Sequence, residues 1–459
     1  MSKIRFHLAV IAAKLTGKLI RLLGRKGSHN PGVVALKICP NFMDLAPRAP
    51  LVICVTGTNG KTSVSNMLAD ALIATGRNVV SNRAGSNIVP GCVTNLVNSL
   101  SWTGKCIADT TVFETDERAS RLILPHLKPD YMIVTNLSRD TLKRNAHTDY
   151  IFSIIDTYCP ETVKLILNAD CTCSSQLRPG NDRVFFGVGP QPGDHTEPYN
   201  LIADNILCPK CGTKLQYEYL RYHHIGKAKC PSCDFKSFEP DYLANEVDRE
   251  NRQVSVTIRG QQMTYPLIND MMHNLYNEMA IIALLDQIGV SLEEIGRIMG
   301  LIKMPDIRYN ETVVGHLTLI TTMGKGQSSV AVSRNFDFVS NEPEDKTVIL
   351  NMDDPNDSRR SVEYMGWIYD VEYEQLVRDN IKQILVTGAR CYDHKARLLL
   401  AGVPEEKILC VMDEMEAMDH VKLTDVEKIY HIFDLTKLNL ANQMKQKLVA
   451  RMEGLRNEN

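Results

Sequence analysis

The stretch LVICVTGTNGKTS, residues 51–63, decides the fold class of this chain. Its first part is a short apolar run typical of a buried strand, and residues 63–74 have the pattern of the helix that follows. Between them, glycines allow backbone N–H groups to close around phosphate oxygens at a helix N-terminus. Strand, turn, Lys-Thr pair and helix together predict a nucleotide-binding α/β domain.

The turn and the next strand end supply the predicted ATP and magnesium ligands. Lys61 would reach the β- and γ-phosphates, and the Thr62 hydroxyl would ligate Mg²⁺. Because Mg²⁺ needs hard oxygen ligands, Glu114 is the best carboxylate candidate, with Asp116 and Glu117 beside it. A solvated acidic strand end is the alternative. The predicted ATP-binding residues of the turn are Gly57, Thr58, Asn59, Gly60, Lys61 and Thr62.

Short apolar runs alternate with helical stretches in two parts of the sequence, one before and one after its middle. The runs at 111–113, 131–135 and 165–167 predict a parallel sheet with helices on both faces. Residues 196–265 interrupt the pattern, a helical pattern covers 273–298, and a second alternating pattern begins near Leu317. We therefore expect a basic N-terminal helical segment, a central ATP-binding domain and a C-terminal α/β domain, at residues 1–48, 49–300 and 301–459.

Composition excludes several classes of protein. The chain has 459 residues, 44% of them hydrophobic, and a formal net charge of −2, which argues against general nucleic-acid binding. Its apolar runs are shorter than the roughly 18 residues that span a bilayer. We expect a cytoplasmic protein, with peripheral association at the inner face of the cell membrane as a further expectation.

The N-terminal segment has a distinctive charge pattern. Residues 1–43 contain eight basic residues and no acidic residue. Apolar residues recur at helical spacing, which predicts a basic amphipathic helix: Ile4, Leu8, Ile11, Leu15 and Leu19. This stripe either packs on the main body or lies at the surface near anionic lipid, and the sequence leaves both interpretations open.

Four cysteines form two CxxC pairs, Cys208 with Cys211 and Cys230 with Cys233. Their spacing is typical of zinc sites in which four thiolates complete a tetrahedron. With all four positions filled, the predicted zinc ribbon, at about residues 203–238, is structural. Nucleic-acid binding is the usual alternative for a ribbon, but little basic and aromatic surface is evident nearby.

The motif TGTNGKT at 56–62 resembles the phosphate loop of Mur ligases and folylpolyglutamate synthases. Nearly the whole chain resembles, as a divergent member, the MurT family, the ligase subunits of lipid II isoglutaminyl synthase. The stretches that carry the resemblance are the cysteine ribbon and residues 82–87, 135–136 with 139–140, 167–170, 275–277, 367–370 and 386–388. The resemblance implies a Mur-ligase-type central parallel-sheet ATPase domain with an inserted four-cysteine zinc ribbon, plus a C-terminal α/β domain.

The resemblance also implies a reaction and a partner. ATP would phosphorylate the α-carboxylate of D-glutamate in lipid II, and ammonia would convert the acyl phosphate to D-isoglutamine. The ammonia would come from a glutaminase subunit of the GatD type in a heterodimer. Asp357 matches the family position that completes that partner's Cys-His-Asp triad, whereas a turn rich in Asp, Asn and Pro is the alternative.

Weaker signals and departures leave other functions open. Asn277 falls in a region that resembles the Mur contact to the nucleotide base, and Arg390 follows a strand from which it could face ATP. The chain differs from the family at Thr141, Lys143, 307–308 and 322–326, where Lys325 is a possible replacement lysine. The alternatives are an amide ligase acting on another acid or amine, and an ATP-binding scaffold without catalysis.

Overall fold

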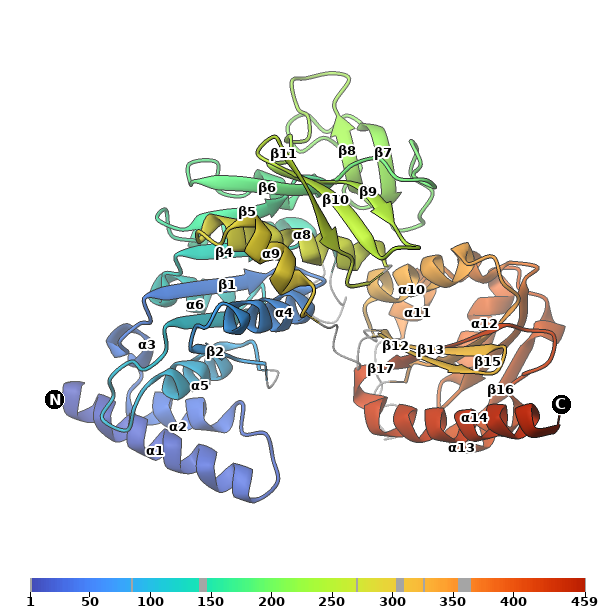
Figure 1. The fold of residues 1–459 in the computed structure, drawn as a ribbon, viewed down its shortest axis with the longest axis horizontal. Helices are drawn as coiled ribbons and strands as arrows, with labels where there is room; N and C mark the ends of the chain where they lie inside the picture. The colour runs from blue at the N-terminus through green and yellow to red at the C-terminus, as the bar shows by residue number, and fades with distance from the viewer. Residues whose placement is uncertain are drawn as a thin grey trace. The chain divides into compact units, whose positions relative to one another are not determined.

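The structure is a computed structural model of the chain (Figure 1). It describes residues 2–83, 86–139, 147–269, 271–302, 309–324, 327–353 and 365–458. The chain divides into two compact units. Unit 1 comprises Met1–Ser138, His147–Tyr199 and Ala203–Lys303; unit 2 comprises Arg139–Ala146, Asn200–Ile202 and Met304–Asn459.

Unit 1 is built on a nine-stranded sheet in the order β11-β10-β9-β6-β5-β4-β1-β3-β2. The strands from β2 to β9 in this order are parallel, and β10 and β11 extend the sheet in antiparallel fashion. Their bounds are β1 (Leu51–Thr56), β2 (Val79–Ser81), β3 (Thr110–Glu114), β4 (Tyr131–Val134), β5 (Lys164–Asn168), β6 (Arg183–Val188), β9 (Tyr242–Asp248), β10 (Gln253–Ile258) and β11 (Gln261–Pro266).

Helices cover both faces of this sheet because its central strands are apolar on both sides. Successive side chains of a strand point to opposite faces. In β1, Ile53 and Val55 contribute to one core cluster, whereas Val52 and Cys54 contribute to clusters on the other face. The first face carries α4 (Lys61–Ala74), α8 (Met272–Gln287) and α9 (Leu292–Met299); the second carries α5 (Val89–Ser99), α6 (Ser120–Leu127) and α7 (Thr148–Tyr158).

Two parts of unit 1 differ from the pattern expected from sequence. The expected helix over 273–298 is two helices, because Gly289 turns the chain at φ +86° and the Ser291 side chain then caps α9 by accepting from the Glu294 N–H. The interval 196–265 contains more than the cysteines, since β9 and the antiparallel hairpin β10–β11 extend the main sheet. The cysteines flank a separate two-stranded sheet, β7 (Gln216–Tyr222) and β8 (Ile225–Lys229).

Three helices precede β1. The first, α1 (Ser2–Leu22), packs with α2 (Asn30–Ile38) and α3 (Phe42–Leu45) against α5. Across the described parts of the chain, no helix has the length and apolar character needed to cross a membrane.

Unit 2 has a six-stranded sheet in the order β12-β13-β17-β14-β15-β16, in which only the β12–β13 pair is antiparallel. Separate core clusters lie on the two faces of this sheet. The strands are β12 (Tyr309–Val314), β13 (Leu317–Gly324), β14 (Lys346–Asn351), β15 (Ile381–Thr387), β16 (Ile408–Val411) and β17 (Lys428–Asp434); the longer helices are α10 (Ser329–Asn341), α12 (Cys391–Leu400) and α14 (Leu438–Glu458).

Candidate functional site

The glycine-rich turn joins the end of β1 to the first residue of α4. Gly57 and Gly60 both have positive φ, +124° and +88°. A Cβ atom on Gly57 would lie 2.3 Å from the Thr135 hydroxyl oxygen, and one on Gly60 would lie 2.5 Å from the Asn277 amide oxygen. Only glycine combines these backbone angles with this close approach of neighbouring segments.

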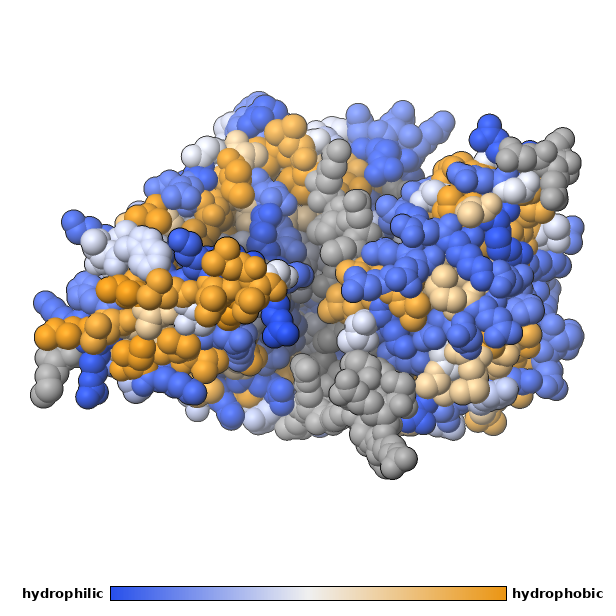
Figure 2. Space-filling model, turned by 90° about the horizontal axis from the view of Figure 1, so that it is seen from below, coloured by the Kyte–Doolittle hydropathy of each residue, from blue (hydrophilic) through white to orange (hydrophobic). Residues whose placement is uncertain are grey.

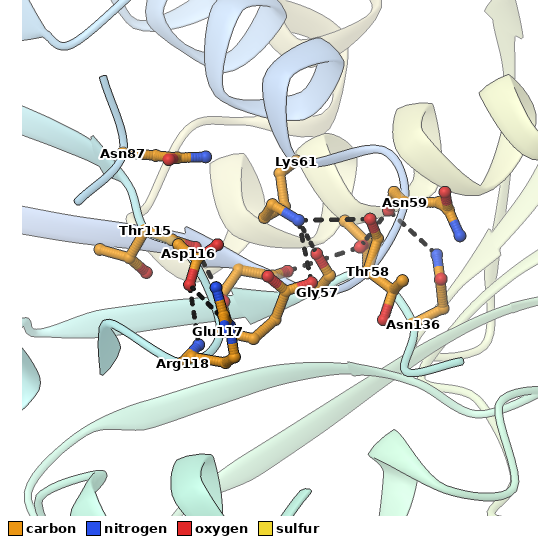
Figure 3. A network of polar contacts seen from close by, with 12 residues as sticks. Gly57, Thr58, Asn59, Lys61, Asn87, Thr115, Asp116, Glu117, Arg118 and Asn136 are labelled. Carbon is orange, nitrogen blue, oxygen red and sulfur yellow. Dashed lines mark hydrogen bonds and ion pairs between the residues drawn. The ribbon is translucent and has the colours of Figure 1, made fainter. Parts of the chain in front are cut away.

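Hydrogen bonds from the end of β4 hold the turn in place (Figure 3). The Thr58 backbone N–H donates to the Asn136 carbonyl at 2.8 Å, and the Thr58 hydroxyl donates to the Ser138 carbonyl at 3.0 Å. The Asn59 carbonyl accepts from the Thr135 hydroxyl at 2.5 Å and from the Asn136 amide at 3.1 Å. The turn is therefore fixed by contacts that involve its backbone.

The Lys61 side chain lies inside the turn, as Figure 3 shows, although it is charged and buried. Its ammonium donates to Glu117 Oε1 at 2.9 Å, to the Thr58 carbonyl at 3.2 Å and to the Gly57 carbonyl. The Glu117 side chain is also buried. A buried ion pair of this kind requires compensating hydrogen bonds, and it holds the ammonium among the backbone groups of the turn.

The Thr62 hydroxyl and the Glu114 carboxylate meet beside Lys61. The hydroxyl donates to Glu114 Oε1 at 3.0 Å, and the Asn87 amide donates to the same oxygen at 2.9 Å. Asn82 fixes the Glu114 backbone by accepting its N–H and donating to its carbonyl, both at 2.8 Å. Carboxylate and hydroxyl oxygens are the hard donors that Mg²⁺ takes, so this pair fits the predicted magnesium site.

The other two acidic candidates have different surroundings. Asp116 accepts the backbone N–H groups of Arg118 and Ala119 at 3.0 and 3.1 Å, so it organises the turn that leads into α6. Glu117 pairs with Lys61. Of the three neighbouring carboxylates, the hydrogen bond to Thr62 is therefore made by Glu114.

The remaining predicted contacts lie in different parts of the chain. Asn277 is buried in α8, where it approaches Gly60 and donates to Asn274 Oδ1 at 3.2 Å. Arg390 precedes α12 in unit 2, and its backbone N–H donates to Asp353 Oδ1 at 3.1 Å. Some residues singled out in the sequence analysis lie outside the described ranges: Asp357, Thr141, Lys143, Lys325 and 307–308.

The four cysteines of the predicted ribbon converge at the base of the β7–β8 hairpin. Their sulfur atoms all lie within 4.8 Å of one another, and the pairs Cys208–Cys233 and Cys211–Cys230 are 3.6 and 3.4 Å apart. Four sulfurs at about 2.3 Å from a tetrahedral zinc ion are about 3.8 Å apart. The cluster therefore fits a zinc ion. A small apolar cluster that includes Leu215, Tyr217 and Phe235 packs beside it.

Cys54 in β1 and Cys92 in α5 have the surroundings of core residues. Burial raises the pKa of Cys54 to about 12 and that of Cys92 well above its usual value. A thiol whose pKa is raised in this way stays protonated at neutral pH and is a poor nucleophile. Cys54 and Cys92 therefore pack as small core residues.

Sequence reasoning missed the residues that support the turn from elsewhere. Asn87, Thr135 and Asn136 lie in segments used for the family resemblance, but no role was expected for them at the phosphate loop. The ion pair between Lys61 and Glu117 was also not expected. The signal was weak because each contact joins segments more than 20 residues apart.

Comparisons with known proteins agree with this geometry. Residues 55–183 match the Mur ligase middle domain, and residues 328–438 match the MurT ligase C-terminal domain. The lipid II isoglutaminyl synthase (glutamine-hydrolyzing) subunit MurT of Staphylococcus aureus strain COL is 27% identical over 398 residues, covering 86% of this chain and 88% of that protein. The Streptococcus pneumoniae R6 subunit of the same name is 26% identical and covers 94% and 95%.

The chain matches MurT subunits over most of its length and has the Mur ligase middle domain and the MurT ligase C-terminal domain. Its fold is also that of a solved pseudomurein peptide ligase type C from Methanothermus fervidus, with a TM-score of 0.63, 17% identity, and coverage of 87% of this chain and 79% of that one. Mur ligases use ATP with Mg²⁺ and take part in peptidoglycan synthesis. These matches make this chain a ligase related to peptidoglycan synthesis, and the matched MurT proteins are named as subunits of a complex.

Proposed function

We propose that this chain is the ligase subunit of a lipid II isoglutaminyl synthase. It would use ATP to convert the α-carboxylate of D-glutamate in lipid II to the carboxamide of D-isoglutamine. The observation that carries the proposal is a Mur-type phosphate turn, with Lys61 and the Thr62–Glu114 pair, in a chain similar over most of its length to two MurT subunits.

A carboxylate resists attack by ammonia because its oxygen is a poor leaving group. Transfer of the γ-phosphoryl group of ATP to this oxygen gives an acyl phosphate and ADP. Ammonia then adds to the acyl carbon, and phosphate leaves with the former carboxylate oxygen while the nitrogen loses one proton to the surroundings and keeps two. In such a reaction the protein's main task is to position the reactants and neutralise charge.

The phosphate turn would supply that positioning. Backbone N–H groups of Gly57, Asn59 and Gly60 and the Lys61 ammonium would hold the phosphates, and Thr58 would anchor the turn through its N–H bond to Asn136. Thr62 and Glu114 would hold Mg²⁺, which offsets phosphate charge. Asn277 touches the turn and would contact the nucleotide from α8. Arg390 is proposed as the contact from the C-terminal domain.

We further propose a glutaminase partner of the GatD type as the source of ammonia. The names of the two MurT relatives, which describe a glutamine-hydrolysing synthase subunit, support this proposal. Asp357 would complete the partner's Cys-His-Asp triad, where a carboxylate orients the histidine and stabilises its charged form. The substrate, lipid II, would be met at the inner face of the cell membrane.

The cysteine cluster is proposed to hold structural zinc. Four thiolates fill a tetrahedral shell, so no position remains for water or substrate. In sequence, the ribbon falls within the proposed central domain, residues 49–300. This domain follows the segment 1–48 and precedes the C-terminal domain 301–459. Its small apolar cluster indicates that metal ligation contributes much of its stability.

Reconstitution with a glutaminase tests the proposal. The chain and a candidate partner are purified together and incubated with lipid II, ATP, Mg²⁺ and glutamine, and the product is examined by mass spectrometry. Conversion of one carboxylate to a carboxamide is expected, and Lys61→Ala should abolish it. ATP turnover without any amidated product would contradict the proposed reaction.

A further inference from the structure

The N-terminal helix α1 turns its apolar stripe towards solvent. The side chains at spacings of three and four residues along this stripe are between 42% and 76% exposed: Ile4, Leu8, Ile11, Leu15, Leu19 and Leu22. Leu23, just beyond the helix, is 70% exposed. Figure 2 shows a continuous hydrophobic band over this part of the surface, on the left of the view. Contiguous exposed apolar surface of this kind marks an interaction site.

The opposite face of α1 explains why the stripe is left outside. Phe6, Ala9, Val10 and Ala13 are buried, and they join residues of α2, α3 and α5 in one core cluster. Because a helix has 3.6 residues per turn, these positions lie across the axis from Leu8 and Leu15. The helix is thus anchored to the protein by one face and presents the other.

Positive charge borders the exposed stripe. Lys18 and Arg21 are exposed within α1, and Arg25 and Lys26 follow directly after it. The first 43 residues have eight basic and no acidic residues, whereas the whole chain has a net charge of −2. Of the supporting helices, α2 and α5 contain no acidic residue, and α3 contains Asp44, which lies 2.7 Å from His126 Nδ1. An anionic surface is therefore the complementary partner.

An exposed tryptophan lies beside the same helix. The Trp102 side chain is 51% exposed, and the Lys14 ammonium lies 5.8 Å from the centre of its ring. The loop that carries Trp102 is held against α1, since a Cβ atom on Gly104 would lie 3.1 Å from atoms of Phe6 and His7. Tryptophan is enriched at membrane–water interfaces because its ring is apolar and its N–H is polar.

We propose that α1 is a membrane-docking helix that binds the surface of a bilayer containing anionic lipid. The leucine and isoleucine stripe would enter the boundary between headgroups and acyl chains, while Lys18, Arg21 and their neighbours contact acidic headgroups. The inference rests on α1 and the elements packed on it. It does not depend on the proposed ligase reaction.

Vesicle co-sedimentation of the full-length chain tests this proposal. The probes are vesicles of phosphatidylglycerol with phosphatidylcholine and vesicles of phosphatidylcholine alone. The chain is expected to bind the anionic vesicles preferentially, with binding that weakens as salt is added. The double variant Leu8→Gln/Leu15→Gln should lower the partition coefficient at least about tenfold, and Lys18→Glu/Arg21→Glu should do the same.

Leu399→Gln/Leu400→Gln is the matched control, because it removes two exposed leucines from α12 in unit 2. It should bind vesicles as the unaltered chain does, and circular dichroism should show that all variants melt alike. Equal vesicle binding by the unaltered chain and the Leu8→Gln/Leu15→Gln variant would overturn the proposal. The proposal would also be overturned if the unaltered chain does not bind vesicles and is a dimer that becomes a monomer in that variant. A second copy of the chain would then cover the stripe.

Discussion

At the residue scale, Lys61 has the position that constrains the chemistry most closely. Its ammonium lies within hydrogen-bonding distance of the Gly57 and Thr58 carbonyls and of Glu117, inside the turn proposed to hold phosphate. A lysine held there needs little rearrangement to neutralise charge on a transferred phosphoryl group. The same burial means that its removal leaves the Glu117 carboxylate without this counter-charge.

Lys61→Ala is predicted to lower substrate-dependent ATP turnover by at least about a hundredfold, because one preorganised charge at a reacting phosphate contributes about 3 kcal/mol or more. It should also lower the free energy of unfolding by about 3 kcal/mol, as expected when one partner of a buried ion pair is removed. Phosphate release and denaturant unfolding measure the two effects. Lys105→Ala, at an exposed lysine in the loop before β3, is the control and should change neither quantity.

Gly60→Ala is predicted to destabilise unit 1 by about 1–3 kcal/mol and to weaken nucleotide binding. The new Cβ would lie 2.5 Å from Asn277 Oδ1, at a backbone φ of +88° that L side chains rarely adopt. Thermal unfolding with and without ATP measures both effects. Adding Asn277→Ala to Gly60→Ala separates the causes: it should recover the part due to the contact and leave the backbone strain. Full recovery would contradict the strain account.

Residues of the site were predictable where they are consecutive in sequence. The spacing of Gly57, Gly60, Lys61 and Thr62 is itself the phosphate-loop motif, so this part of the site can be recognised from the sequence alone. Sequence identifies Glu117 only as a neighbour of Glu114, since no local pattern pairs an acid with a lysine 56 residues earlier. Such pairings depend on strand order, which the sequence of one chain specifies only indirectly.

At the scale of the elements, the ribbon is the part most dependent on a ligand. Its apolar cluster is small, and four thiolates converge within 4.8 Å. Removal of zinc by a chelator is predicted to expose residues 203–238 to hydrogen exchange and proteolysis, while β1, β3 and β4 keep their protection. Cys230→Ser should produce the same pattern and lower the bound zinc. Unchanged protection of the ribbon after complete zinc removal would count against a structural metal.

Unit 2 contains two buried histidines that should make its stability depend on pH. Burial lowers the pKa of His394 and of His431 to about 4, against about 6.5 in an unfolded chain. The unfolded chain therefore binds more protons between these values, so stability is full above pH 6.5 and falls as the pH drops to 4, by up to about 3 kcal/mol for each histidine.

Urea unfolding between pH 4 and 7, monitored with a signal that reports on unit 2, checks the histidine prediction. His431→Gln should reduce the slope of unfolding free energy against pH by the amount that corresponds to one bound proton, whatever its effect on stability at pH 7. His316→Gln is the control, because His316 is exposed. A slope that His431→Gln leaves unchanged would show that this residue is not held neutral.

The elements differ in how well sequence could predict them. Apolar runs gave the strands β1, β3, β4 and β5 because parallel strands buried on both faces are continuously hydrophobic. In the hairpin β10–β11 at the sheet edge, β10 alternates buried and partly exposed residues and β11 is largely exposed, so neither strand is a continuous apolar run. In α1 the helix was predicted, but only the structure shows that the packed face is formed by Phe6, Ala9, Val10 and Ala13 rather than by the leucine stripe.

At the scale of the whole molecule, an ATPase that acts on a lipid-linked substrate gains from binding near the bilayer. Docking through α1 would raise the concentration of such a substrate around the enzyme without any change in its catalytic residues. The two proposals are separable in experiment, because loss of docking should spare turnover of a soluble substrate analogue. Loss of Lys61 should abolish turnover of both substrates.

The proposed link with the glutaminase gives another test at this scale. Asp357→Asn is predicted to lower glutamine hydrolysis by the complex about a hundredfold or more, because the partner's histidine would lose its orienting carboxylate. Amidation supplied with free ammonium should survive, since the phosphate turn is unaltered. Measuring the two nitrogen sources side by side distinguishes a triad role from general damage. Unchanged glutamine-dependent amidation in Asp357→Asn would remove this residue from the triad.

The central claim is that the turn at residues 57–62 binds ATP for the activation of a lipid II carboxylate. The most direct measurement incubates the complex with lipid II whose reacting carboxylate carries ¹⁸O at both oxygens, together with ATP and ammonia, and follows the label by mass spectrometry. The account predicts one ¹⁸O atom in the released phosphate for each carboxamide formed, and none with Lys61→Ala. Carboxamide formation without transfer of ¹⁸O to phosphate would contradict it.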